Sequence, residues 1–172
     1  MAGREHLKIL VSLVLVLVSV TGGVLPARAL EWGLITPGRT TMDDVRAHYG
    51  EATRAVTQKV DGYDTTQWIY EGGKAPVGIE RMIVDFGILT PQGYRPQIVR
   101  SLLLHPRHGV FNRDLVVQGW GPPTGKGEQS GFPAYFYEDG LFVSFDKEAW
   151  EVKSMLFTTK QKIPAPQSAP PR

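Results

Sequence analysis

The side chains of this sequence best suited to hold a metal ion are two histidines three residues apart, His105 and His108. Imidazole nitrogens are common zinc ligands, but a structural zinc site usually has four ligands at regular spacings. Here Pro106 favours an extended local backbone, and no third ligand follows at a matching distance. We therefore interpret the pair as part of an ordinary loop and predict no metal site.

Two glycine-containing segments match nucleotide-binding and hydrolase motifs only in part. A phosphate-binding loop ending in Gly125-Lys126 requires a glycine where this chain has Trp120, and Ser or Thr where it has Gly127. A nucleophile elbow requires glycines two residues before and after its serine, and the residues around Ser130 do not provide them. Neither motif is complete, so we predict no bound cofactor.

The carboxylates are scattered along the chain and fit helix caps and turns. Three fall in the first turns of predicted helices and four near predicted turns: Asp43, Asp44 and Asp114, then Asp61, Asp64, Glu138 and Asp139. The chain also has no cysteine to act as a nucleophile and no recognisable catalytic triad. We therefore predict that the protein is not an enzyme, and an enzyme of unrecognised type is the least favoured alternative.

Two stretches of matching sequence are the elements around which the rest of the chain is arranged. Residues 41–53 match residues 112–124 at a constant offset of 71. In each copy a side-chain oxygen, from Thr41 or Asn112, is placed to cap a short helix that ends at a glycine. Helices this short are stable only when docked, so each must pack on the remainder of the fold.

Alternation of apolar and polar residues predicts strands after each helix. The first series covers 55–60, 66–71, 80–88 and 97–105, and the second covers 134–138, 141–146 and 151–158, with loops at 72–78, 87–96 and 121–131. This order predicts an α+β protein, a tandem repeat of a short helix and a three- or four-stranded antiparallel meander. We expect repeat 1 over 30–106 and repeat 2 over 107–163, in one continuous sheet with the helices on one face.

A family resemblance lies in the same residues: Pro37-Gly38-x-Thr40-Thr41-x-Asp43-Asp44-Val45, then Tyr49-Gly50, Trp68-x-Tyr70 and Val84-x-Phe86. This series resembles the small exported domains of the SmpA/OmlA type, found in outer-membrane assembly lipoproteins. The tandem arrangement resembles the β-lactamase inhibitory protein-like fold, which has two such repeats. The resemblance implies this fold, but no functional residue is transferred, because the matched positions are caps, turns and core residues.

Residues 1–29 are typical of a secretory signal. A basic start precedes the apolar residues 9–20, and Ala27-Arg28-Ala29 predicts cleavage before Leu30. The alternative is an uncleaved membrane anchor, but a crossing helix needs about 20 apolar residues. We therefore predict an exported protein, periplasmic, cell-surface or extracellular, without membrane insertion after cleavage.

The charge of the predicted mature chain is balanced. Removal of the signal takes three basic and one acidic residue from totals of 19 and 17, which leaves 16 of each sign. A net charge of zero argues against nucleic acid or an anionic membrane surface as a partner. Residues 164–172 hold four prolines and few apolar side chains, so we predict a disordered tail.

Four aromatic residues are the candidate partner-binding site: Trp68, Tyr70, Tyr135 and Tyr137. Each pair projects from one face of its strand, either into the core beneath the helices or onto an uncovered face. Binding surfaces are enriched in Tyr and Trp, so we predict that at least two of the four lie on the open face and contact another exported or envelope protein. The favoured function is a protein-binding, inhibitor-like module that uses the open sheet face and the long loops, and the alternative is a structural component of a cell-envelope assembly.

Overall fold

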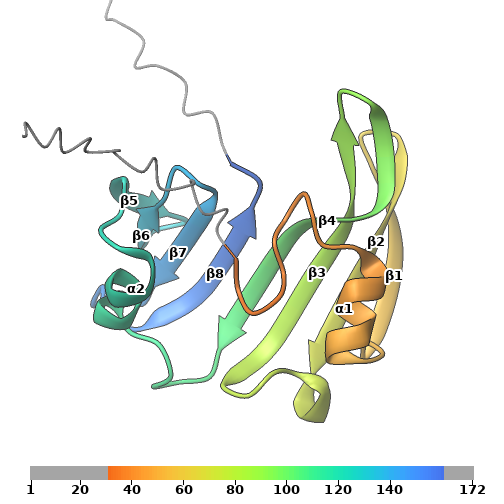
Figure 1. The fold of residues 1–172 in the computed structure, drawn as a ribbon. Coiled ribbons are helices and arrows are strands. Elements are labelled where there is room, and N and C mark those ends of the chain that lie inside the picture. The colour runs from red at the N-terminus through yellow and green to blue at the C-terminus, as the bar shows by residue number, and fades with distance from the viewer. Residues whose placement is uncertain (1–30, 161–172) are drawn as a thin grey trace, which may run out of the picture.

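The computed structural model describes residues 31–160 (Figure 1). These residues form, in chain order, α1 (Met42–Tyr49), β1 (Arg54–Val60), β2 (Tyr63–Glu71), the 3-10 helix η1 (Gly72–Lys74), β3 (Ile79–Thr90), β4 (Gly93–Pro106), α2 (Arg113–Trp120), β5 (Gly125–Gln129), β6 (Phe132–Phe136), β7 (Leu141–Phe145) and β8 (Val152–Thr158). The predicted signal at 1–29, the cleavage before Leu30 and the tail at 164–172 lie outside the described residues.

The eight strands form one antiparallel sheet in the order β1-β2-β3-β4-β8-β7-β6-β5. The prediction of an α+β protein with one continuous antiparallel sheet is confirmed. β4 and β8 pair at the centre, where Leu102 lies opposite Phe157 and Leu104 opposite Met155. Because all four side chains are fully buried, the centre of the sheet is also part of its core.

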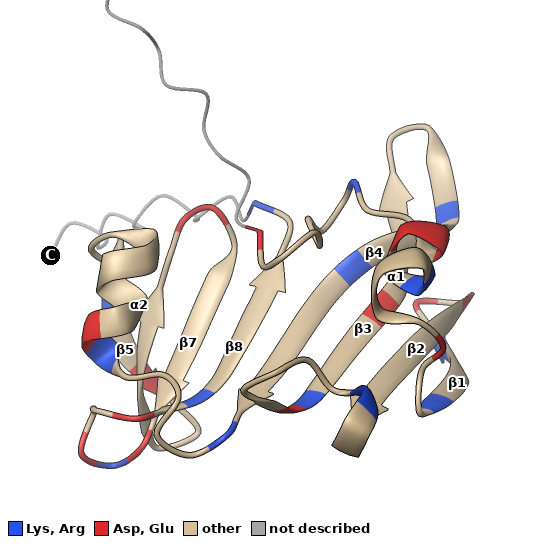
Figure 2. Cartoon of the chain, turned by 60° about the horizontal axis from the view of Figure 1, so that its bottom comes forward, with Lys and Arg blue, Asp and Glu red and all other residues tan. Residues whose placement is uncertain are grey.

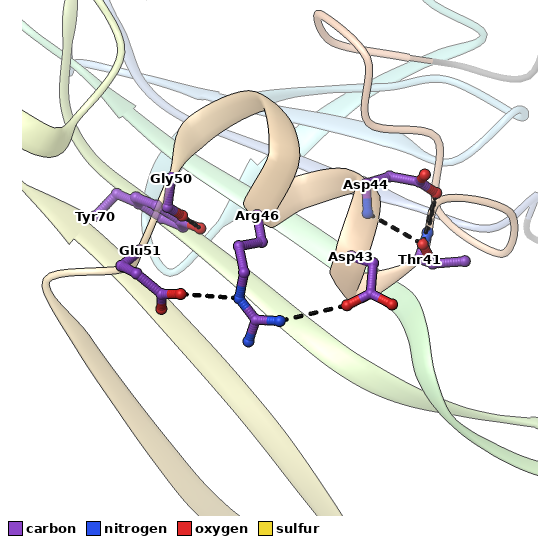
Figure 3. Close-up of polar contacts among 7 residues, drawn as sticks. All are labelled: Thr41, Asp43, Asp44, Arg46, Gly50, Glu51 and Tyr70. Atoms are coloured by element: carbon purple, nitrogen blue, oxygen red, sulfur yellow. Dashed lines mark hydrogen bonds and ion pairs between the residues drawn. The ribbon is translucent and has the colours of Figure 1, made fainter.

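The start of each helix follows from the capping residue that the sequence predicts. Thr41 Oγ1 accepts a hydrogen bond from the Asp44 N–H at 3.1 Å, and Asp44 Oδ2 accepts one from the Thr41 N–H at 2.8 Å (Figure 3). Asn112 Oδ1 accepts one from the Leu115 N–H at 3.0 Å. A glycine with a positive φ, 74° after α1 and 80° after α2, ends each helix without strain.

One face of the sheet, called here the core face, carries the hydrophobic core. Successive cross-strand neighbours on it form a row of buried and partly buried side chains: Tyr70, Met82, Leu104, Met155, Val143 and Tyr135. Val45 of α1 and Val116 of α2 belong to the same core cluster. Each is the one fully buried residue of its helix, so docking of both helices depends on this core.

Two predicted loops contain strand residues. The predicted loop at 121–131 includes β5, which pairs with β6 over its whole length. Its sequence, Gly-Lys-Gly-Glu-Gln, has no apolar alternation and gave no strand pattern. The predicted loop at 87–96 is the tip of a long hairpin, in which Thr90 pairs with Gly93.

Within the described residues, no helix has the length and apolar character needed to cross a membrane.

Candidate functional site

The four predicted binding aromatics lie on the core face. Trp68, Tyr70 and Tyr137 are 5%, 0% and 7% exposed, and Tyr135 packs partly buried against the same core. Trp68 meets Phe86 edge-on, with ring centroids 4.8 Å apart. The prediction that at least two of these rings lie on an open face is therefore wrong. Their alternation places them in register with the core positions of the neighbouring strands, and large apolar rings gain most by burial there.

The tyrosine hydroxyls have a structural role at the ends of the helices. Tyr70 Oη donates a hydrogen bond to the Gly50 carbonyl at 3.1 Å (Figure 3), and Tyr137 Oη donates one to the Gly121 carbonyl at 3.1 Å. Burial raises the pKa of each tyrosine to about 12. Both phenols therefore stay protonated and act as donors that satisfy a helix-terminal carbonyl.

The opposite face of the sheet, called here the outer face, carries a second apolar series. Because side chains alternate along a strand, these residues lie between the core positions. Each is the cross-strand neighbour of the next, over six strands: Ile69, Ile83, Leu103, Leu156, Phe142 and Phe136. This set, called the apolar row, does not belong to the core cluster. Ile69 is buried, at 5% exposed, and the other five are partly exposed, so five of the six side chains are open to contact.

A cluster of polar side chains lies beside the apolar row on the outer face. Gln67 Nε2 donates to Asp85 Oδ1 at 2.9 Å, and Ser101 Oγ donates to Asp85 Oδ2 at 2.8 Å. Arg100 Nη2 lies 3.9 Å from Asp85 Oδ1. Since both carboxylate oxygens have a donor, Asp85 is held as an acceptor and is poorly placed to act as a general base.

A stacked tyrosine pair extends the outer face toward the β3–β4 hairpin. The rings of Tyr63 and Tyr94 lie 4.4 Å apart, and Tyr94 Oη donates to the Asp64 carbonyl at 2.6 Å. Tyr63 is 40% exposed. The hollow between this pair, Leu89 and Arg100 holds about 80 Å³, well below the roughly 300 Å³ of a small-molecule site. This end of the face is therefore better suited to a protein surface than to an enclosed ligand.

A larger hollow, of about 320 Å³, lies between the start of α1 and β4. It is lined by Thr41, Tyr94, Arg95, Pro96, Gln97 and Ile98. These residues include no carboxylate, histidine or thiol, and the Thr41 hydroxyl is engaged in the helix cap. The hollow provides no general base or activated nucleophile among its lining residues.

The two histidines of the sequence motif do not converge. His108 Nδ1 lies 2.6 Å from Glu151 Oε1, whereas His105 lies on β4 opposite Arg81. Glu151 Oε1 also accepts from the Gly109 N–H at 2.7 Å, and this hydrogen bond is the main cause of a lowered pKa of Glu151. Within residues 31–160 no group of three or more metal-ligating side chains is close enough to hold an ion.

Sequence reasoning predicted an open sheet face but missed the residues that lie on it, because they come from six strands. The available signal was the central strand near residue 100, which is apolar at both alternating positions, so that Leu102 and Leu104 enter the core while Leu103 faces outward. Charged residues of both signs are interspersed among the described elements (Figure 2). The outer face therefore combines an apolar centre with a polar flank and an aromatic end.

No protein-family model, curated protein or solved structure matches this chain.

Proposed function

We propose that this protein is a non-enzymatic, inhibitor-like binding module that engages another exported or envelope protein through the outer face of its sheet. The observation that carries the proposal is the apolar row, six apolar side chains side by side that lie outside the core cluster. With strands about 4.8 Å apart, six strands span about 24 Å. That width suits a standard protein interface, which buries about 800 Å² on each partner.

The composition of the outer face also supports a protein partner. Interface centres are apolar and depleted of charge, and Tyr and Arg are enriched among the residues that dominate affinity. Here Leu103 and Leu156 occupy the centre, while Tyr63, Tyr94 and Arg100 stand at one end. The outer face thus has an apolar centre that can anchor a partner, with polar and aromatic side chains at its rim. The four core aromatics do not provide such a surface.

The proposal includes both helices on the core face, so that the outer face stays uncovered. The support is that Val45 of α1 and Val116 of α2 share one core cluster with the inward residues of the strands. Two eight-residue helices, each about 12 Å long, are too short to cover both faces of an eight-stranded sheet.

We also propose that residues 30–106 and 107–163 are two repeats of one unit, in keeping with the SmpA/OmlA-type and β-lactamase inhibitory protein-like resemblance. Equivalent contacts support this proposal. Thr41 and Asn112 cap the two helices, and Tyr70 and Tyr137 bind the carbonyls that follow them. The strand order, which runs from each outer edge to the central pair, is also that expected of two joined meanders.

Site-specific photo-crosslinking in the producing cell tests the proposed function. A photoreactive residue at Leu156 should trap a discrete protein partner, because this side chain lies at the centre of the apolar row. The matched control is the same residue at Val77, which is fully exposed in the loop before β3. Equal crosslinking from both positions, or none from Leu156, would overturn the proposal.

A charge substitution then measures the contribution of the apolar row. Leu103→Asp should weaken binding of the trapped partner by 2 kcal/mol or more, in the range of about 2–4 for a hot spot. Val77→Asp should leave binding unchanged. A large, stable set of crosslinked envelope proteins, instead of one partner, would favour the structural alternative.

A further inference from the structure

The sheet has a second exposed feature, the free side of strand β5. β5 is the last strand in the sheet order and pairs with β6 alone. Its residues 126–129 are exposed. An unpaired strand edge carries free N–H and C=O groups and is a template for another strand.

The side chains of β5 are complementary to the same strand reversed. Lys126 and Glu128 stand on either side of Gly127, and both point to the core face, opposite Tyr135 and Pro133 of β6. Neither forms an ion pair within residues 31–160. Lys126 Nζ lies over the Tyr135 ring, 5.2 Å from its centroid. The two charges are therefore available to an approaching chain.

We propose that two copies of this chain pair through β5, antiparallel and centred on Gly127. In that register Lys126 of each copy lies opposite Glu128 of the second copy, so that two cross-strand ion pairs form. Opposite charges directly across antiparallel strands stabilise pairing. The result is one continuous sheet built from two eight-stranded sheets.

Two of the three β5 residues on the outer face are glycines. Gly125 and Gly127 alternate with the two charges and carry no side chain on the outer face. The ring of Phe136 lies over Gly127, because a Cβ there would be 3.2 Å from Phe136 Cε2. The one side chain of β5 on that face is that of Gln129, which in the proposed register lies opposite Gly125 of the second copy and meets no side chain there.

The opposite edge of the sheet lacks this complementarity. β1 carries Arg54 and Lys59 and no acidic residue, and Lys59 Nζ is already 3.2 Å from Asp64 Oδ1. Reversed pairing of β1 about Thr57 brings no opposite charges together. Edge lysines and arginines of one sign disfavour self-association, so the charges select β5 as the edge that a second copy occupies.

Exposed apolar side chains at the same end add to the contact. Leu115 and Val117 of α2 and Phe132 of β6 are all large, apolar and exposed, whereas α1 has no exposed large apolar residue. In Figure 1, α2 lies at the β5–β6 end of the sheet. The surface buried by pairing two five-residue strands alone is below the roughly 1,000 Å² of a stable interface, so we expect a weak dimer.

Charge exchange tests the pairing in solution. Lys126→Glu and Glu128→Lys should each weaken self-association, measured by sedimentation equilibrium at low salt, about tenfold, because two attractive pairs become repulsive. Mixing the two variants should restore association to near the unaltered level, since every facing pair is then opposite in charge. The double variant with both substitutions should self-associate for the same reason.

Lys59→Glu on β1 is the matched control and should leave self-association unchanged, and equal thermal midpoints confirm that all variants are folded. The proposal is overturned if the unaltered protein is monomeric at every concentration, if the mixture or the double variant fails to recover association, or if Lys59→Glu weakens it as much. The pairing leaves the apolar row uncovered, so its test is independent of the proposed function.

Discussion

Glu151 is a buried carboxylate that connects the segment after β4 to the start of β8. Its side chain is 11% exposed and accepts from His108 and from the backbone of Gly109, with Lys153 3.8 Å away. These donors stabilise the charged form and lower its pKa, with the Gly109 hydrogen bond as the main cause. The unfolded chain therefore binds a proton at Glu151 more readily than the folded chain does.

The pH dependence of stability follows from that sign. The contribution of Glu151 is complete above its unfolded pKa and is lost as the pH falls through the folded pKa. We expect Glu151→Gln, whose amide oxygen can still accept from Gly109, to flatten the acid side of the stability curve measured by urea unfolding. Glu148→Gln, at a neighbouring exposed position, is the control. If the free energy of unfolding falls equally with decreasing pH in the unaltered protein and in Glu151→Gln, this assignment is wrong.

The buried tyrosine hydroxyls provide a second test at the residue scale. Tyr70→Phe and Tyr137→Phe each remove one hydrogen bond to a helix-terminal carbonyl and should lower the free energy of unfolding by about 0.5–1.5 kcal/mol. Tyr63→Phe, at a 40% exposed ring, should change it little. If all three substitutions change the free energy of unfolding equally in denaturant titrations, the two hydrogen bonds do not stabilise the fold.

At the scale of elements, both helices depend on one capping side chain and one buried valine. Thr41→Ala and Asn112→Ala should each lower the free energy of unfolding by about 0.5–2 kcal/mol, because a free N–H loses its acceptor. Serine at either position should restore most of the loss, since its hydroxyl can make the same bond. A serine variant as unstable as the alanine variant would argue against capping as the cause.

The β3–β4 hairpin depends on glycine at two positions with different surroundings. Gly87 and Gly93 have φ of +100° and +112°, and a Cβ at Gly87 would collide with the Tyr94 hydroxyl, whereas Gly93 has open space. Gly93→Ala should therefore cost only backbone strain, about 1–3 kcal/mol. In the same thermal unfolding experiment, Gly87→Ala should lower the free energy of unfolding by more than Gly93→Ala does. Equal losses would show that the Tyr94 contact does not restrict position 87.

The elements that the sequence predicted are those with local signals. Thr41 and Asn112 mark helix starts through their own hydrogen bonds, and the alternation around Trp68 marks a strand. β5 has no such signal: its glycines and charges become a strand because β6 supplies a ladder and Phe136 needs the space over Gly127. The apolar row was equally hidden, because only the register between strands aligns its members.

The choice between the two faces of the sheet also required the structure. In the strand around residue 100, Leu102 and Leu103 are equally apolar, so alternation alone does not identify the buried side. The structure identifies the buried side of the sheet, because Leu102 is buried beside Phe157 and Trp68 is buried beside Val84. The sequence predicted that each pair of aromatics shares one face of its strand, but the face that both pairs share is the core face.

At the scale of the whole molecule, the central β4–β8 pair makes the two halves of the sheet one unit. Leu102→Ala should lower the free energy of unfolding by about 2–5 kcal/mol, because it empties a fully buried site at the centre. We expect calorimetry to give one transition, with calorimetric and van't Hoff enthalpies equal, for the unaltered protein and the variant. Two separated transitions would show that the halves melt independently.

The central position of β8 also sets the order of events during synthesis. β4, one of the longest strands, ends at Pro106, and its neighbour on the other side, β8, ends at Thr158, 52 residues later. At about 5–20 residues per second, roughly 3–10 s pass between them. During that interval β4 lacks its β8 partner, and its free edge, where Leu102 and Leu104 are not yet paired with Phe157 and Met155, is open to other chains.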